Sequence, residues 1–130
     1  MSKHTVLLAD DNSHLREIFV QQLREHYRVR GVGTGDALLE ALDQSVDAVV
    51  CDWKLNGMQK TDLLNAIGQT AGELGIVVMS GSLPSRDLRP HGVDECLEKP
   101  FKTDTLRDAI NSAIEGGTGA SVTHVQSPVQ

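Results

Sequence analysis

The fold of this chain is decided by residues 46–55, which read VDAVVCDWKL. The first part of this stretch is a short apolar run rich in β-branched residues, which is typical of a strand buried on both faces. Asp52 stands where that predicted strand leaves the core. In open parallel sheets, ligands bind in the crevice beyond the carboxyl ends of the strands. On its own, however, an aspartate at this place fits equally well a residue that caps the following loop.

Four more stretches have the character of strands. Residues 5–9 and 75–79 are apolar and predict further buried strands, whereas residues 27–32 and 94–98 mix polar and apolar side chains and predict strands at the edges of the sheet. Helical patterns separate these strands along the chain. The alternation predicts an α/β fold, in which a doubly wound, five-stranded parallel sheet of order 2-1-3-4-5 has helices on both faces, as in flavodoxin-like proteins.

The predicted helices differ in how clearly the sequence marks them. Asn12 or Ser13 is placed to cap the first helix, because both side chains can accept backbone N–H groups. The last helix has the clearest apolar stripe, at positions i, i+3, i+4, i+7 and i+8. That stripe consists of Leu106, Ala109, Ile110, Ala113 and Ile114.

Glycine and proline mark the ends of the remaining helices. Gly68 and Gly72 are expected to punctuate the end of the helix that follows the Asp52 strand. Pro84 and Pro90 leave space for only one or two helical turns between them, so the fourth helix is expected to be shortened. The glycine-rich residues 31–36 lack the last glycine of a dinucleotide-binding fingerprint and follow the wrong strand, and we interpret them as a turn and a helix cap.

Length and composition limit the classes of function. The chain has 130 residues, and we expect one domain at 3–115 followed by a disordered tail or linker at 116–130. The net charge of −6, from 18 acidic and 12 basic side chains, argues against direct nucleic-acid binding by this domain. We expect no signal peptide and no membrane span. Cys51 and Cys96 fit reduced thiols in the cytoplasm.

Five side chains are predicted to meet at one end of the sheet: Asp10, Asp11, Asp52, Ser80 and Lys99. Three carboxylates in one crevice repel each other unless a cation lies among them, and Mg²⁺ is the hard cation that suits oxygen ligands and phosphoryl groups. Asp can accept a phosphoryl group covalently. The hydroxyl of Ser80 and the ammonium of Lys99 are donors suited to phosphoryl oxygens.

These residues lie in four motifs, which are LLADD at 7–11, DWKL at 52–55, MSG at 79–81 and LEKPF at 97–101. With them the chain resembles the receiver domains of two-component response regulators over residues 3–115. The resemblance implies a receiver fold, Mg²⁺ as cofactor, and a sensor histidine kinase or a histidine phosphotransfer protein as partner. It does not identify the downstream effector.

The resemblance also implies a role for each residue of the acidic cluster. Asp52 is the expected phosphoacceptor and a ligand of Mg²⁺. Asp11 is expected to bind Mg²⁺ directly, and Asp10 to help place the ion, partly through water. The backbone carbonyl of Lys54 is expected to be a further ligand.

Two donors complete the implied site. Ser80 is expected to bond the phosphoryl group and to move with it, and Lys99 is expected to pair with that group. The resemblance also makes the peptide bond between Lys99 and Pro100 a candidate for the cis form.

Three positions depart from the usual receiver pattern. Asn56 stands where a proline is usual, Lys60 stands where a glycine is usual, and Cys96 replaces the aromatic residue that normally turns inward on activation. The chemistry of phosphorylation is therefore better supported by the sequence than the surface that carries the signal onward.

The leading hypothesis is a phosphoryl-accepting module of a phosphorelay, which catalyses its own phosphorylation and dephosphorylation without being a turnover enzyme. One alternative is a phosphatase with an aspartate nucleophile, but the sequence offers neither a cap domain nor a second catalytic acid. The other alternative is a pseudo-receiver, which would act as a protein interaction module without phosphorylation. Stable incorporation of phosphate from a small phosphodonor in the presence of Mg²⁺ would distinguish them.

Overall fold

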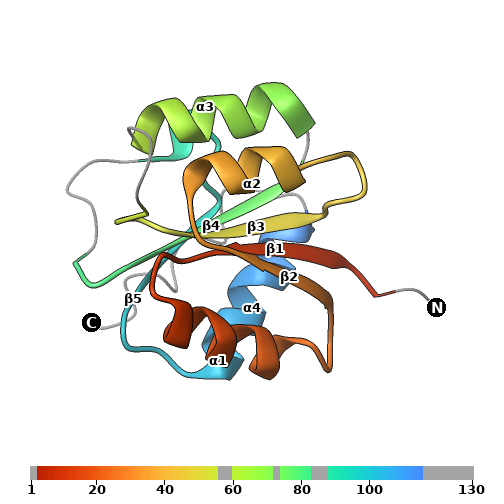
Figure 1. Ribbon diagram of the computed structural model, residues 1–130, viewed down its shortest axis with the longest axis vertical. Coiled ribbons are helices and arrows are strands. Elements are labelled where there is room, and N and C mark those ends of the chain that lie inside the picture. Colours follow the sequence, from red (N-terminus) through yellow and green to blue (C-terminus); the bar gives the residue numbers. More distant parts are fainter. Residues whose placement is uncertain (1–2, 56–59, 72–73, 83–87, 116–130) are drawn as a thin grey trace.

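The computed structural model describes residues 3–55, 60–71, 74–82 and 88–115, and within them five parallel strands form one sheet (Figure 1). The order of the strands is β2-β1-β3-β4-β5, and every neighbouring pair is parallel. The predicted doubly wound topology is therefore confirmed. The strands are β1 (Thr5–Ala9), β2 (Arg28–Val32), β3 (Ala48–Asp52), β4 (Gly75–Ser80) and β5 (Glu95–Glu98).

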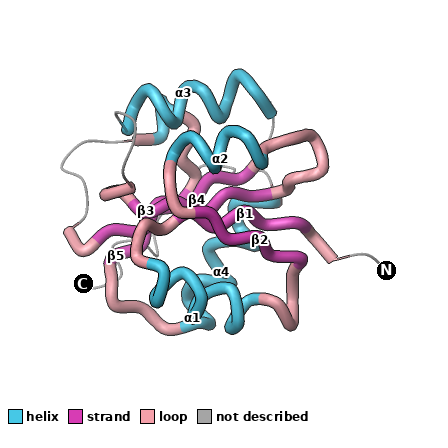
Figure 2. Tube along the Cα trace, in the orientation of Figure 1, coloured by secondary structure: helices cyan, strands magenta, loops and turns pink. Residues whose placement is uncertain are grey.

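Two helices cover each face of the sheet, as Figures 1 and 2 show. On one face lie α2 (Gly35–Ala41) and α3 (Lys60–Ala71), and on the other lie α1 (Ser13–Leu23) and α4 (Thr103–Ile114). Among the described residues, no helix combines the length and the apolar character that a membrane crossing requires.

Each face of the sheet has its own apolar core, because successive strand residues point to opposite sides. In β1, Leu7 packs in the core under α2 and α3, and Leu8 packs in the core under α1 and α4. In β3, Val49 and Val50 divide between the two faces in the same way. Every residue of β3 is buried, as the apolar run around it predicts.

Helix caps fix the loops that follow β1 and β2. Asn12 caps α1, and its side-chain oxygen accepts the N–H groups of His14 and Leu15, each at 3.0 Å. Thr34 caps α2 by accepting the N–H of Ala37 at 3.0 Å. Of the two residues that the sequence offered for the first cap, Asn12 takes this role, while Ser13 is the first residue of the helix.

The region between β4 and β5 contains, among the described residues, a single 3₁₀ turn at Arg89–His91 in place of a full helix. The turn ends at Gly92, whose φ of 92° favours glycine. Residues 83–87 lie outside the described part of the chain. The predicted shortening of the fourth helix agrees with the part that is described.

One expectation drawn from the sequence needs correction, and another, the edge position of β5, is confirmed with one buried acidic side chain. Gly68 does not end the third helix but lies inside α3, which continues to Ala71. The polar strand β5 is an edge strand, yet the side chain of Glu95 is fully buried, because Glu95 and Leu97 share the face of β5 that α4 covers. The predicted tail at 116–130 and Gly72 lie outside the described residues.

Candidate metal and phosphoryl site

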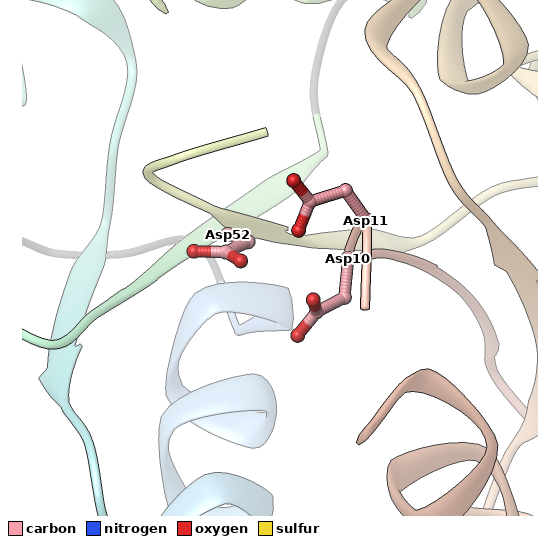
Figure 3. Close-up of side chains that lie close together, drawn as sticks. All are labelled: Asp10, Asp11 and Asp52. Carbon is pink, nitrogen blue, oxygen red and sulfur yellow. The ribbon is translucent and has the colours of Figure 1, made fainter. Parts of the chain in front are cut away.

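The acidic residues gather at the carboxyl ends of β1 and β3. The register pairs Ala9 with Cys51, so the next residues, Asp10 and Asp52, leave the sheet side by side. Asp11 follows in the loop after β1. One carboxylate oxygen from each of these three aspartates lies within 4.8 Å of the other two, and Figure 3 shows the side chains close together.

Asp10 and Asp52 each use one oxygen to hold their own loop. Oδ1 of Asp10 accepts the N–H of Asn12 at 3.0 Å, and Oδ1 of Asp52 accepts the N–H of Lys54 at 3.1 Å. Aspartate commonly closes turns by bonding the backbone two residues onward. Asp52 therefore does cap its loop, and this capping leaves its second oxygen available to the crevice.

Lys99 lies between these second oxygens. Its Nζ is 3.4 Å from Oδ2 of Asp10 and 3.5 Å from Oδ2 of Asp52. The lysine follows β5, and its N–H donates to the carbonyl of Ser80 at 2.7 Å, so the backbone of both strands holds it in place. The peptide bond from Lys99 to Pro100 is cis, as the resemblance implied. Lys99 thus offsets part of the negative charge of the cluster.

Burial differs sharply within the cluster. Asp10 is fully buried and Asp52 is 6% exposed, whereas Asp11 is exposed to solvent. Burial raises the pKa of Asp10, and the charge of Asp52 raises it further, while the N–H of Asn12 and the ammonium of Lys99 lower it. A cation at this place would stabilise the charged form of Asp10, which burial opposes.

Ser80 occupies the end of β4, next to the residue that pairs with Asp52. The register pairs Asp52 with Met79, and Ser80 follows Met79 and pairs with Glu98 of β5. Its buried hydroxyl donates to the carbonyl of Ser82 and accepts the N–H of Ser82 at 3.1 Å. The hydroxyl is therefore engaged with its own loop at the rim of the crevice.

The turn after β3 is tied to the neighbouring strand. The N–H of Trp53 donates to the carbonyl of Met79 at 2.7 Å, and the N–H of Leu55 donates to the carbonyl of Asp52 at 3.0 Å. Lys54 lies in this turn with an exposed side chain. Asn56 lies outside the described residues.

Cys96, which stands in place of the usual aromatic residue, is half-buried beside the core under α2 and α3. It lies in β5 opposite Val78 of β4. The side chain therefore contributes to packing at the edge of the sheet.

Sequence reasoning missed one residue of this site. Arg16 of α1 donates from Nη1 to the backbone carbonyl of Asp10 at 2.7 Å. The sequence indicates this role only indirectly. It places an arginine one turn into the first helix, and it places Gly31 and Gly33 at the end of β2.

Comparisons with known proteins agree with this geometry. The family model of the response regulator receiver domain matches residues 6–111, so the chain belongs to the response regulator receiver family. It is 30% identical over 118 residues to the hydrogenase transcriptional regulatory protein HoxA of Cupriavidus necator, a match that covers 85% of this chain and 24% of HoxA. The chain thus spans about a quarter of the length of that relative.

Solved structures of response regulators share the fold. The receiver domain of a LuxO repressor protein from Vibrio parahaemolyticus superposes with a TM-score of 0.77 at 23% identity, covering 91% of this chain and 95% of that domain. A response regulator from Burkholderia pseudomallei, solved with a phosphorylated aspartic acid, a calcium ion and citrate, gives a TM-score of 0.75 at 20% identity over 92% of this chain and 74% of that protein.

The donor atoms of the cluster fit a hard divalent cation. They are carboxylate oxygens, and Mg²⁺ binds such oxygens while it keeps several waters. Asp11 is exposed, so solvent reaches the cluster there, whereas Asp10 is buried and held by the hydrogen bond that it accepts from the N–H of Asn12. The five residues that the sequence predicted at this end of the sheet thus lie at neighbouring strand ends, and four of them are linked by the distances given above.

Proposed function

We propose that this domain accepts a phosphoryl group on Asp52 from a phosphohistidine donor and thereby carries a signal in a two-component phosphorelay. The observation that carries the proposal is the joint position of Asp52, the two neighbouring carboxylates and Lys99 at one end of the sheet. The donor would be a sensor histidine kinase or a histidine phosphotransfer protein. Cys51 and Cys96 are not joined in a disulfide, which fits a reducing compartment such as the cytoplasm.

In the proposed reaction, a carboxylate oxygen of Asp52 forms a bond to phosphorus while the phosphorus–nitrogen bond of the donor breaks. The bonding electron pair stays on the donor nitrogen, which takes a proton from solvent, so the donor is released as neutral histidine. Mg²⁺, held by Asp11 and Asp52, by Asp10 partly through water, and by the backbone carbonyl of Lys54, would neutralise charge on the phosphoryl group. Attack of water on the aspartyl phosphate would release inorganic phosphate and restore the free carboxylate of Asp52. We propose that this hydrolysis serves to end the signal rather than to turn over a substrate.

Lys99 and Ser80 would receive the phosphoryl oxygens. Lys99 already contacts Oδ2 of Asp52 at 3.5 Å, so it lies close to any group attached to that carboxylate. The hydroxyl of Ser80 would leave its bonds to Ser82 and donate to the phosphoryl group instead. This exchange would couple the chemistry at Asp52 to the loop that follows β4.

The test is phosphorylation of the full chain by acetyl phosphate in the presence of MgCl₂, followed by intact-mass spectrometry. We expect one added phosphoryl group, which Asp52→Asn and an excess of EDTA both prevent. A chain that binds a partner protein while it gains no phosphate under these conditions would instead support the pseudo-receiver alternative.

A further inference from the structure

The side chain of Arg16 lies across the end of β2, in space that is available because Gly31 and Gly33 have no Cβ atom. A Cβ atom added at Gly31 would lie 3.1 Å from Cγ of Arg16, and one added at Gly33 would lie 2.9 Å from its Nη1. Any other residue at Gly33 would therefore push the guanidinium aside. The space at Gly31 accommodates both Arg16 and Val20, whose Cγ2 would also lie 3.1 Å from an added Cβ, whereas the three atoms nearest to a Cβ added at Gly33 all belong to Arg16.

The guanidinium of Arg16 reaches the backbone of Asp10, which belongs to the acidic cluster. Nη1 of Arg16 donates to the carbonyl oxygen of Asp10 at 2.7 Å, and the N–H of Asp10 donates to the carbonyl of Val32 at 3.1 Å. Both polar groups of the Asp10 backbone are therefore held, one by α1 and one by β2. A hydrogen bond from a charged donor is stronger than one between neutral groups.

From this geometry we infer that Arg16 is a positioning residue, which orients Asp10 and Asp11 and thereby sets the affinity of the site for a divalent cation. The inference rests on the proposed metal-dependent function. It adds to that function a residue outside the acidic cluster, and it assigns Gly33 the role of keeping the guanidinium on the carbonyl of Asp10.

Two effects of Arg16 on a cation oppose each other, and this opposition makes the inference testable. The positive charge of the guanidinium repels a cation nearby, so loss of that charge alone should tighten Mg²⁺ binding. Loss of the positioning bond should weaken binding, because residues that orient metal ligands typically change affinity by about 10- to 100-fold when they are replaced. The sign of the change therefore reveals which effect dominates.

The experiment is a Mg²⁺ titration of the full chain, followed by the fluorescence of Trp53 and by isothermal titration calorimetry. Arg16→Met keeps the length of the side chain without its donors, and we expect it to weaken Mg²⁺ binding by about 10-fold or more. Arg16→Lys keeps a charged donor, and we expect it to bind Mg²⁺ more tightly than Arg16→Met. An effect of charge alone would give the reverse order.

Gly33→Ala provides an independent test that leaves Arg16 in the protein. The added methyl group displaces the guanidinium, so we expect weaker Mg²⁺ binding, and we expect no further weakening when the same change is made in the Arg16→Met background. Gly68→Ala is the matched control, since a Cβ there meets no atom within 4 Å, and it should leave the affinity unchanged. Melting curves without Mg²⁺ verify that each variant is folded.

The outcomes separate this inference from the proposed function. If the wild-type chain ignores millimolar Mg²⁺, both are overturned. If the wild type binds Mg²⁺ and Asp11→Ala does not, but Arg16→Met binds as tightly as the wild type or more tightly, only the role of Arg16 is overturned. That role is also overturned if Gly33→Ala weakens binding equally with and without Arg16.

Discussion

Both ends of the sheet carry aspartates, but the two sets are used in different ways. At the amino ends, Asp47 precedes β3 and Oδ2 of its side chain accepts the N–H of Thr5 at 2.8 Å, while Asp94 precedes β5 and Oδ2 of its side chain accepts the N–H of Ile76 at 2.9 Å. Each carboxylate there serves one neighbouring strand. At the carboxyl ends, Asp10 and Asp52 instead share a lysine.

The difference shows that a place at the end of a strand does not by itself give an aspartate a chemical role. At the amino ends the described hydrogen bonds join carboxylates to the backbone of adjacent strands, and they strengthen the sheet. At the carboxyl ends the carboxylates keep oxygens directed at one another and at Lys99. Crowded carboxylates raise the free energy of the folded protein, and a cation bound among them would relieve that cost.

The largest expected effect is on phosphorylation, which should differ between substitutions of Asp52 and of Asp47. Asp52→Asn should abolish phosphorylation by acetyl phosphate, because an amide cannot form the acyl phosphate. Asp47→Asn retains an oxygen that can accept the N–H of Thr5, and it should be phosphorylated like the wild type. Intact-mass spectrometry measures both. Phosphorylation of Asp52→Asn at the wild-type level would contradict the proposal that the aspartates at the two ends of the sheet have different roles.

The second prediction concerns stability at the amino end. Asp94→Ala leaves the N–H of buried Ile76 without the acceptor that Asp94 provides, and it should lower the free energy of unfolding by about 1–3 kcal/mol. Urea denaturation measures this loss. Asp94→Asn, which keeps an oxygen acceptor, is the control and should lose clearly less. Neither variant should change phosphorylation once it is folded.

The third prediction concerns stability at the carboxyl ends of the strands, where we expect a substitution to raise the free energy of unfolding rather than lower it. Asp11→Asn removes one charge from the acidic cluster, so without Mg²⁺ it should raise the free energy of unfolding by about 0.5 kcal/mol or less. The gain should shrink in high salt, which screens repulsion between exposed charges. Denaturation in EDTA at low and high salt provides the measurement. A clear loss of stability would contradict the view of the site as a crowded pocket.

The smallest effect is a dependence on pH. Burial raises the pKa of Asp94, although the N–H of Ile76 lowers it in part. Above the ordinary value of 3.8, the folded state therefore keeps a proton that the unfolded state has lost, and stability falls as pH rises through this window. Asp94→Asn does not titrate, so the stability of the wild type relative to this variant should decline as pH rises from about 4. Urea melts across that range measure the difference, and a rise would contradict it.

The sheet and the acidic cluster could be predicted from the sequence because both follow from local patterns. Apolar runs such as residues 5–9 define buried strands, and the rule for strand ends then brings Asp10 and Asp52 together. The buried edge of β5 could not be predicted, since burial of Glu95 depends on how α4 covers that face. Gly68 was misinterpreted as a helix end because packing of the whole helix outweighs the cost of one glycine.

Arg16 could not be predicted for a similar reason. Its bond to the carbonyl of Asp10 depends on space left by Gly33, which lies just after β2. The sequence shows the arginine and the glycine, but only the packing of α1 against β2 shows that one accommodates the other. Patterns within a segment predict elements, whereas roles that arise between segments require the fold.

The two hydrogen bonds between the side chain of Ser80 and the backbone of Ser82 have a consequence for signalling. Under the proposed function, the hydroxyl of Ser80 would have to give up both partners before it reached the phosphoryl group, at a net cost of about 1–3 kcal/mol. We would then expect the signalling conformation to make up only a minor fraction of the unphosphorylated population, on the order of one part in 5 to 150. In that proposal these bonds would set the activity of the domain before phosphorylation, and the interaction of Ser80 with the phosphoryl group would have to be stronger than both bonds together to favour the signalling conformation.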